Sequence, residues 1–214
     1  MKFKQLDITG FKSFSEKTTV LIEEGLTGIV GPNGCGKSNI VESLRWCMGE
    51  NSAKSMRGSG MEDVIFSGTS NKPSKNISEV TLLLDNQNKE GPSHYKEFDE
   101  ISVRRKIERD KGSKYYVNDK EVRARDVQTL FADLSTGAHS PSLISQGKIG
   151  QLVTAKPIER KSILEEAAGI SGIHARRQEA ETRLNAAENN LKRADELKRQ
   201  QEKQLDSLKK QAEE

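Results

Sequence analysis

The chain has little cysteine, few aromatic residues and no long apolar run. Two cysteines in 214 residues are too few for the disulfide framework of a secreted protein, and they indicate a reducing compartment. No segment approaches the length of a membrane-spanning helix, about eighteen apolar residues. The amino-terminal MKFKQLDITGF alternates apolar and polar residues and lacks the apolar core of a signal peptide. We therefore expect a cytoplasmic protein, and we expect no membrane partner.

Charge of one sign is not in large excess. The sequence has 35 Lys and Arg against 32 Asp and Glu, and its net charge of +3 is too mild to indicate nucleic acid by itself. Any contact with DNA must therefore come from local clusters. Arg104, Arg105 and Lys106, with Arg109, could meet DNA phosphates non-specifically. A solvated strand edge explains the same cluster equally well.

A glycine-rich octet at residues 31–38 is the most informative motif that is present. Its sequence, GPNGCGKS, satisfies the phosphate-binding pattern GxxxxGK[ST]. The apolar residues 26–30 before it predict a strand, and a helix is predicted directly after it at 37–48. The octet therefore lies in the strand, loop and helix context that the pattern demands. The alternative is an ordinary glycine-rich turn that contains a lysine by chance.

The residue types of the octet suit a nucleoside triphosphate. Its glycines, Gly31, Gly34 and Gly36, permit positive φ angles, so that successive N–H groups can converge on phosphate oxygens. The predicted helix points its positive end at the same phosphates. Lys37 adds an ammonium group that can reach the β- and γ-phosphates, and Ser38 supplies a hydroxyl for Mg²⁺. The sequence therefore predicts a site for a nucleoside triphosphate with Mg²⁺.

Predicted strands fill most of the remainder up to about residue 134. Beta-branched and aromatic residues predict them at 3–8, 18–22, 79–85, 101–107 and 115–122, the last a hairpin that turns at Asn118-Asp119. The helix at 37–48 is the only long one predicted among them. From Pro157 onward the pattern is helical, with interruptions at Gly169 and Gly172.

Residues 173–214 contain no glycine, proline or aromatic residue and predict one uninterrupted helix. Core positions recur along it at alternating spacings of three and four, which is the seam of a left-handed coiled coil. A single solvated helix is the alternative, but helices this polar are marginal in water when unpaired. Nothing else in the chain can pair with it, so the partner strand must come from elsewhere. The seam consists of Leu184, Ala187, Leu191, Ala194, Lys198, Gln201, Leu205, Leu208 and Ala212.

These features together resemble the amino-terminal half of the ATPase head of structural maintenance of chromosomes (SMC) proteins, in particular the bacterial chromosome-segregation members. Five motifs carry the resemblance in the family's order and approximate spacing. They are GFKSF at 10–14, GPNGCGKSNI at 31–40, MRG at 56–58 with MEDVIF at 61–66, ISQG at 144–147, and KP at 156–157 leading to EEAAGI at 165–170.

The resemblance implies an α/β fold of the ATP-binding-cassette (ABC) type. The expected half-head has a mixed sheet that carries the phosphate loop, an antiparallel β region and a long coiled-coil helix that leaves it. The amino-terminal lobe of the head is expected at residues 1–170. The start of the arm, truncated in mid-heptad, is expected at residues 171–214.

The resemblance also assigns roles to individual residues. Lys37, Gln146 and Arg57 are implied to be catalytic. Gln146 resembles the Q-loop glutamine, which joins Ser38 as a Mg²⁺ ligand and helps to place the attacking water, and Arg57 resembles the R-loop arginine, which is coupled to DNA-stimulated hydrolysis. A loop glutamine in water and a solvated loop arginine are the alternatives. The implied ATP-binding residues are Gly31, Pro32, Asn33, Gly34, Cys35, Gly36, Lys37, Ser38, Asn39, Lys12, Ser13 and, near the base, Asp63.

Two segments imitate motifs of a complete ATPase. Residues 80–85, VTLLLD, look like a Walker B strand, but Asn86 follows where a catalytic glutamate is required, so we interpret them as an ordinary strand. LSTG at 134–137 echoes the LSGG signature of ABC enzymes, yet it lies upstream of Gln146, and we interpret it as a loop. The signature and Walker B motifs are therefore expected in a carboxyl-terminal half, within a protein several times longer.

The implied function is that of an ATPase whose heads dimerise on ATP and whose arms organise, condense and segregate chromosomal DNA. ATP and Mg²⁺ are the implied cofactors. The implied partners are the carboxyl-terminal half of the same head, a second copy in a homodimer, double-stranded DNA and kleisin-type subunits, with a nucleoid-associated location. A repair ATPase of the same superfamily is the alternative, and a transporter's nucleotide-binding subunit is a further one, although it would lack the heptad tail. The chain alone is expected to be inactive.

Overall fold

The computed structural model describes residues 1–89, 91–134, 143, 148–168 and 171–213. The chain divides into two compact units, Met1–Gly172 and Ile173–Glu214, and each is considered by itself. The predicted boundary between head lobe and arm, at residue 170, stays a prediction.

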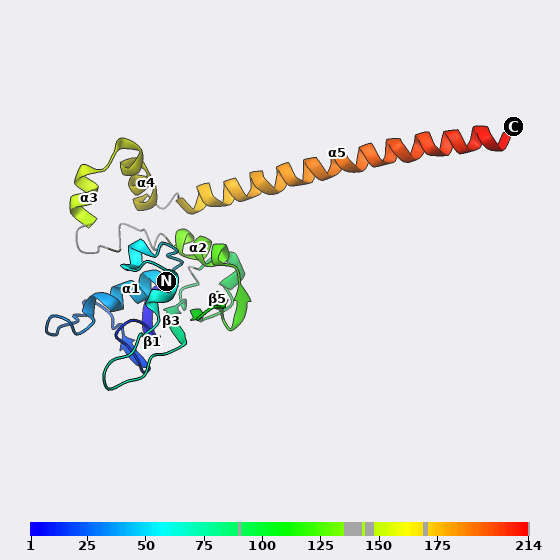
Figure 1. Ribbon diagram of the computed structural model, residues 1–214. Helices are drawn as coiled ribbons and strands as arrows, with labels where there is room; N and C mark the ends of the chain where they lie inside the picture. Colours follow the sequence, from blue (N-terminus) through cyan, green and yellow to red (C-terminus); the bar gives the residue numbers. More distant parts are fainter. Residues whose placement is uncertain (90, 135–142, 144–147, 169–170, 214) are drawn as a thin grey trace. The chain divides into compact units, whose positions relative to one another are not determined.

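A six-stranded antiparallel sheet forms the centre of the first unit (Figure 1). Its strand order is β2-β1-β3-β4-β5-β6, and each neighbouring pair runs antiparallel. The predicted strands at 3–8, 18–22, 79–85 and 101–107 and the hairpin at 115–122 are confirmed. The strands are β1 (Lys2–Thr9), β2 (Thr18–Leu21), β3 (Ile77–Asp85), β4 (Glu100–Glu108), β5 (Gly112–Val117) and β6 (Lys120–Val122).

The hairpin between β5 and β6 turns at the predicted residues. Asn118 and Asp119 have φ angles of 48° and 62°, which is the left-handed pair that a tight hairpin turn needs. The Asn118 carboxamide oxygen also accepts a hydrogen bond from the Ser102 N–H at 2.8 Å, so the turn is tied to β4.

The helices of the first unit are α1 (Lys37–Cys47), α2 (Ala124–Asp133), α3 (Lys148–Thr154) and α4 (Pro157–Ala167), with short 3₁₀ turns at Lys54–Met56, Met61–Val64 and Ser93–Tyr95. Helix α1 packs against β3 and β4, and α2 packs against β5 (Figure 1). Alternate residues of β3 and β4 are buried beneath them. The core therefore lies between one face of the sheet and these helices. Its largest buried members include Trp46, Phe11, Phe131, Leu6, Ile8, Met48 and Leu82.

Helix α2 was not predicted, because the sequence analysis expected only one long helix, at 37–48, before residue 134. Val127, Leu130 and Phe131 are buried at helical spacing, and the Arg123 N–H donates to the Asp126 carboxylate at 3.0 Å, which caps the first turn. Gln128 donates to the Gly49 carbonyl at 2.9 Å and joins α2 to the end of α1. The helical spacing of these apolar residues is visible in the sequence, but the pattern is short and lies in a region where most segments were predicted to be strands.

Residues 26–30, which we predicted to be a strand, are not in the sheet. Leu26 is 99% exposed and Val30 is 93% exposed. A strand needs a neighbour to satisfy its backbone N–H and C=O groups, and no strand in the described part of the chain lies beside this segment. The α/β class is nevertheless confirmed, with an antiparallel β region and a long helix. All strand pairs in the described residues are antiparallel, so the mixed sheet expected to carry the phosphate loop is not formed there.

Residues 80–85 are an ordinary strand, as we interpreted them. They belong to β3, which lies between β1 and β4. The side chain of Asn86 donates to the Tyr95 and Phe98 carbonyls and accepts from the Gly91 N–H, so it organises the following turn. Of the LSTG segment, Leu134 ends α2, and residues 135–137 lie outside the described residues.

Arg105 is a buried cation, which corrects its assignment to a DNA-binding cluster. It occupies a core-facing position of β4, is 2% exposed, and lies between the rings of Trp46 and Tyr115 at 4.5 and 4.7 Å. Its Nη1 donates to the Trp46 and Glu50 carbonyls at 2.8 and 2.7 Å. Burial lowers the pKa of its guanidinium. Arg105 therefore fastens the carboxyl end of α1 to the sheet and cannot meet DNA.

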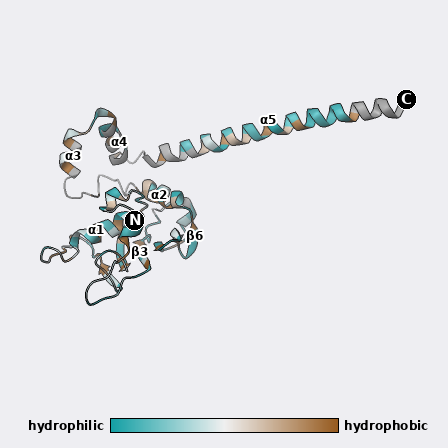
Figure 2. Cartoon of the chain, viewed as in Figure 1, coloured by the Kyte–Doolittle hydropathy of each residue, from teal (hydrophilic) through white to brown (hydrophobic). Residues whose placement is uncertain are grey.

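The described part of the second unit lies entirely in helix α5 (Ser171–Glu213), which confirms the predicted uninterrupted helix. The interruption predicted at Gly172 is wrong, because α5 begins at Ser171 and continues through this glycine. Hydrophilic residues dominate it, with scattered hydrophobic ones between them (Figure 2). The seam leucines Leu184, Leu191 and Leu205 are 62%, 67% and 53% exposed. Pairing of the seam with a second strand stays a prediction. None of the described helices is both long and apolar enough to cross a membrane.

Arg105→Ala should lower the free energy of unfolding by about 3 kcal/mol, because it leaves buried carbonyls without their donor and empties the space between two rings. Arg105→Lys should recover little of that free energy, since an ammonium cannot stack between two rings or form paired hydrogen bonds as a planar guanidinium does. Urea unfolding followed by circular dichroism measures both. Arg104→Ala, on the other face of β4, is the control and should cost under about 1 kcal/mol. Equal losses for Arg104→Ala and Arg105→Ala would contradict the buried role.

Candidate nucleotide site

The glycine-rich octet forms a loop that runs directly into α1. Gly34 and Gly36 have φ angles of 87° and 89°, in the left-handed region that glycine adopts without strain. Gly31 does not have a positive φ, so two of the three glycines do what their pattern predicted. Gly36 is the N-cap of α1, and no side chain caps this end. The first turn of α1 therefore presents its N–H groups toward the loop.

The segment at residues 10–14 packs closely on this loop. A Cβ on Gly36 would lie 2.5 Å from Ser13 Oγ and 3.4 Å from the Phe14 ring. Ser13 Oγ also accepts a hydrogen bond from Asn39 Nδ2 at 2.9 Å. The predicted site residues Ser13, Gly36 and Asn39 are thus adjacent in the structure.

Lys37 folds back over its own loop. Its ammonium donates to the carbonyl oxygens of Gly31 and Pro32 at 2.5 and 2.6 Å. A polyphosphate is a stronger acceptor for an ammonium than two neutral carbonyls, because charge-assisted hydrogen bonds are about twice as strong as neutral ones. Lys37 therefore lies where it can exchange these carbonyls for phosphate oxygens. Pro32, Asn33 and Cys35 are exposed on the same loop.

Lys12 and Arg57 meet beside the first turns of α1, although 45 positions separate them. Both form ion pairs with Glu42, a buried residue of α1 that the motif analysis did not select. Arg57 Nη2 also donates to Asn39 Oδ1 at 3.2 Å, and the Lys12 ammonium donates to the Met56 carbonyl. The structure thus brings Lys12, Ser13, Asn39 and Arg57 to one place. Glu42 could have been found as the carboxylate one helical turn beyond Ser38.

Asp63 organises the turn before it. Its Oδ2 accepts hydrogen bonds from the N–H groups of Ser59 and Gly60 at 2.6 and 2.9 Å and from Ser59 Oγ at 2.8 Å. These bonds, with the Gly60 N–H first, lower the pKa of the Asp63 carboxyl. They explain the residue without a ligand, and its contact with a nucleotide base stays a prediction.

The donor set suits a magnesium ion that is bound mainly through phosphate. No three His, Cys, Asp or Glu side chains gather as a metal site in the part of the chain that the structure describes. Mg²⁺ needs only about one or two protein ligands when phosphate oxygens and water supply the rest. Ser38, exposed in the first turn of α1, fits that need. Gln146, the other predicted ligand, lies outside the described residues.

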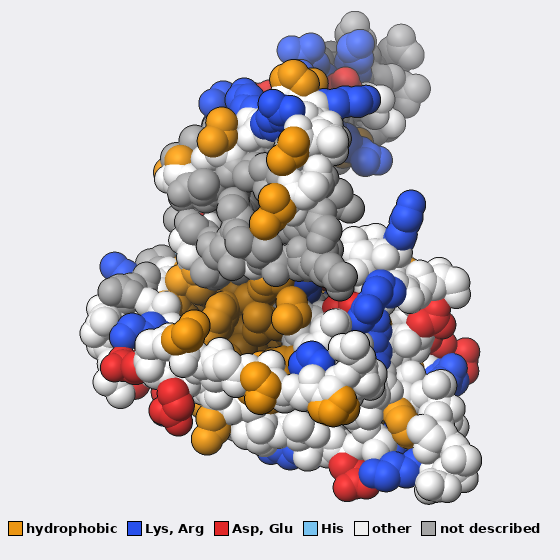
Figure 3. Space-filling view, turned by 90° about the vertical axis from the view of Figure 1, so that its left-hand side faces the viewer, with side chains coloured by type: hydrophobic (Ala, Val, Ile, Leu, Met, Phe, Trp, Pro, Cys, Tyr) orange, Lys and Arg blue, Asp and Glu red, His pale blue; other side chains and the backbone are white. Residues whose placement is uncertain are grey.

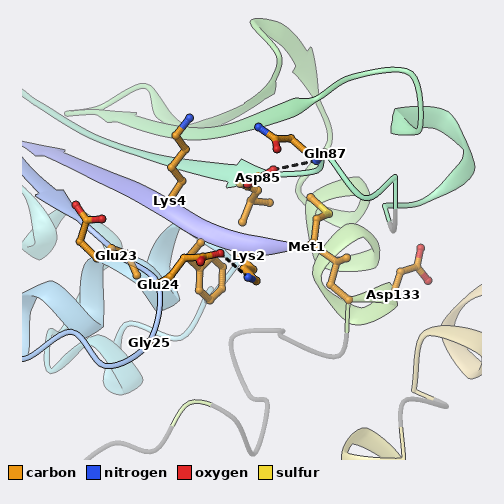
Figure 4. A pocket seen from close by; sticks show the side chains of 13 residues that line it. Met1, Lys2, Lys4, Glu23, Glu24, Gly25, Asp85, Gln87 and Asp133 are labelled. Atoms are coloured by element: carbon orange, nitrogen blue, oxygen red, sulfur yellow. Dashed lines mark hydrogen bonds and ion pairs between the residues drawn. The ribbon is translucent and has the colours of Figure 1, made fainter.

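A hollow of about 880 Å³ lies elsewhere in the first unit (Figure 4). Its lining comes from the start of β1, the end of β3, residues 22–25 and the end of α2, and it includes no residue of the octet. Lys2 and Glu24 form an ion pair across it at 2.7 Å. Hydrophobic side chains also gather in a hollow on the face shown in Figure 3. The polar chemistry of the octet makes that loop the better candidate for a phosphate ligand.

The family model described as "RecF/RecN/SMC N terminal domain" matches residues 2–149. The Chromosome partition protein Smc of Rhodopseudomonas palustris is 55% identical over 212 residues, which are 99% of this chain and 18% of that protein. The protein of the same name from Cereibacter sphaeroides is 57% identical over 197 residues, 92% of this chain and 17% of that protein. The chain therefore spans less than a fifth of the length of these relatives.

Solved structures agree with the fold. An Smc head bound to the C-winged helix domain of ScpA is 29% identical with a TM-score of 0.74, over 82% of this chain and 54% of that one. An Smc head domain with a coiled coil and joint from Pyrococcus yayanosii is 33% identical with a TM-score of 0.70, over 98% of this chain and 40% of that one.

Gly36→Ala should weaken binding of a nucleoside triphosphate by about tenfold, because a left-handed alanine costs about 1–2 kcal/mol and its Cβ would crowd Ser13. Fluorescence titration with a labelled ATP analogue measures the change. Gly28→Ala is the matched control, since Gly28 lacks a positive φ and its Cβ would meet nothing within 4 Å. Unchanged affinity in Gly36→Ala would contradict the assignment of the loop.

Proposed function

Because this chain belongs to the family of RecF/RecN/SMC N-terminal domains, we propose that it is the amino-terminal half of an SMC-type ATPase head that acts in chromosome partition. The observation that carries the proposal is the phosphate loop at the start of α1, with Lys37 folded over it and with Lys12 and Arg57 paired to Glu42 in the second turn of the same helix. Such an arrangement of cations is expected where several phosphate oxygens must be held at once.

Each part of the loop has a separate task in ATP binding. The N–H groups of the glycine-rich turn and of the first turn of α1 hold phosphate oxygens. The Lys37 ammonium leaves the Gly31 and Pro32 carbonyls and turns to the β- and γ-phosphates. The Ser38 hydroxyl and the Gln146 carboxamide would hold Mg²⁺, which would supply positive charge to neutralise the phosphates. Lys12 and Arg57 add positive charge beside them.

A second half is needed to complete the head. The exposed apolar residues 26–30 lead into the phosphate loop, and a strand from outside this chain would satisfy their backbone groups and cover their side chains. We place that strand in a carboxyl-terminal half, which also supplies the signature motif, the Walker B aspartate and the catalytic glutamate. Two completed heads then sandwich two ATP molecules, and hydrolysis separates them.

The arm and the kleisin-type subunit complete the assembly. The exposed seam leucines of α5 bury their side chains against a returning helix of the same protein. One of the similar solved heads is bound to a domain of ScpA, which supports a partner of that kind here. In this scheme the ATP cycle moves the arms, and their movement organises and segregates double-stranded DNA.

Fewer basic residues are candidates for DNA binding than the sequence suggested. Arg105 is in the core, and Arg104 pairs with Asp119 at 3.0 Å and stacks on the Tyr116 ring at 4.5 Å. Arg57 is 59% exposed and lies at the nucleotide site. Arg57 therefore remains the best candidate for coupling DNA to hydrolysis.

The chain alone should bind ATP weakly and hydrolyse almost none, because about half of the groups that hold the nucleotide lie in the other half of the head. A phosphate-release assay with and without an added carboxyl-terminal half measures this. Turnover by the chain alone that disappears in Lys37→Ala would refute the half-site interpretation.

Arg57→Ala in the completed head should remove the stimulation of ATP hydrolysis by double-stranded DNA, because it deletes the guanidinium that can form paired bonds to phosphate. Hydrolysis is measured with and without DNA at one fixed salt concentration, since phosphate contacts depend strongly on salt. Arg109→Ala tests the rival cluster, because it changes an exposed arginine outside the phosphate loop. Stimulation that survives Arg57→Ala but disappears in Arg109→Ala would move the DNA contact to the segment that follows β4.

A further inference from the structure

Glu42 is a buried carboxylate in the second turn of α1, and both of its oxygens are engaged by cations. Glu42 Oε2 pairs with the Lys12 ammonium and Oε1 pairs with Arg57 Nη2. Its side chain is only 10% exposed. We propose that Glu42 is the positioning residue that holds Lys12 and Arg57 beside the phosphate loop. This inference rests on the function proposed above and adds a residue to its machinery.

The backbones of the two cations support this role. Lys12 and Arg57 have φ angles of 46° and 55°, in the left-handed region that residues with a side chain rarely adopt. Each lies in a short loop: the Lys12 N–H donates to the Val64 carbonyl at 2.7 Å, and the Arg57 N–H donates to the Lys54 carbonyl at 3.0 Å. Two strained loops thus deliver their cations to one carboxylate, and such strain persists only where the surroundings enforce it.

Glu42 holds Arg57 and leaves some of its N–H donors available. The bonds of the guanidinium to Glu42 and Asn39 both involve Nη2. Arginine has five N–H donors in a planar fork, so Nε and Nη1 can still donate to a phosphate oxygen. With 59% of its side chain exposed, Arg57 can make those bonds while Glu42 keeps its position.

A carboxylate is the only side-chain group of this size that can serve both cations. A carboxamide has one acceptor oxygen, and its NH₂ group cannot accept from an ammonium or a guanidinium. Glu42→Gln therefore removes the charge that pairs with both cations, Arg57 included, while keeping the shape of the side chain. Glu50→Gln is the matched control: Glu50 is 2% exposed, follows the carboxyl end of α1 and pairs with Arg45 at 2.9 Å, away from the loop.

A double-mutant cycle in the completed head tests the proposal, with Glu42→Gln, Arg57→Ala and the double variant assayed for kcat and KM with DNA present. If Glu42 acts through Arg57, Glu42→Gln should lower kcat by about tenfold, change the KM for ATP by less than about threefold, and add nothing to Arg57→Ala. Glu50→Gln should leave both constants within about twofold of the unchanged head. Effects that multiply in the double variant, or an equal loss in Glu50→Gln, would overturn the positioning role.

A second measurement separates this inference from the proposed function. Phenylglyoxal modifies arginine side chains, and mass spectrometry reads the rate at Arg57 in the chain itself. Glu42→Gln should raise that rate about threefold or more, because Nη2 loses a charged partner, whereas Glu50→Gln should not. Equal rates in all three chains would overturn the inference. ATP turnover that is insensitive to Lys37→Ala would refute the proposed function, and the modification rates would still decide the role of Glu42.

Discussion

The packing of α1 on the buried face of the sheet is the contact on which the site depends. Trp46 and Cys47, near the end of the helix, are fully buried, and the Cys47 thiol donates to the Val80 and Val103 carbonyls of β3 and β4. Burial raises the pKa of that thiol to about 12, so it packs as a small neutral group. The phosphate loop is the amino-terminal extension of this helix. Its position therefore follows from a core contact about three helical turns away.

Charge is arranged differently at the two ends of α1. At the carboxyl end, Arg105 lies on the last carbonyls, where the helix dipole favours a cation. At the amino end, Lys12, Lys37 and Arg57 gather where the dipole disfavours cations. Glu42 offsets part of this repulsion from within the helix. A bound polyphosphate would offset the rest, so the arrangement favours a highly charged anion over a neutral ligand.

The features that depend mainly on residues close together in the sequence could be predicted from it. The spacing of glycines and Lys37 predicted the loop, strand alternation predicted most of the sheet, and the absence of breakers predicted α5. Glu42 was missed because its role depends on two loops that meet only in three dimensions. Arg105 was assigned to the surface because it adjoins Arg104, although the alternation of Ile101, Val103 and Ile107 places it on the buried face. That interpretation gave more weight to the neighbouring positive charges than to the two-residue alternation of the strand.

The strand prediction for residues 26–30 failed for a different reason, because their apolar pattern is that of a strand. Beta structure is completed by a neighbour, and the described chain offers none beside this segment. Strand propensity alone therefore cannot decide whether such a segment is paired. The same limit applies to the seam of α5, whose described leucines are exposed in the single helix.

The open flank at residues 26–30 has a consequence for biosynthesis. In a relative of which 212 residues are 18%, about 960 residues lie outside the stretch that this chain matches. At about 5–20 residues per second, a ribosome needs about one to three minutes to synthesise them. If the covering strand lies among those residues, as proposed above, the apolar segment stays exposed during that interval. An exposed apolar segment with strand character is a site where chains can associate, so early cover of this flank would favour correct assembly.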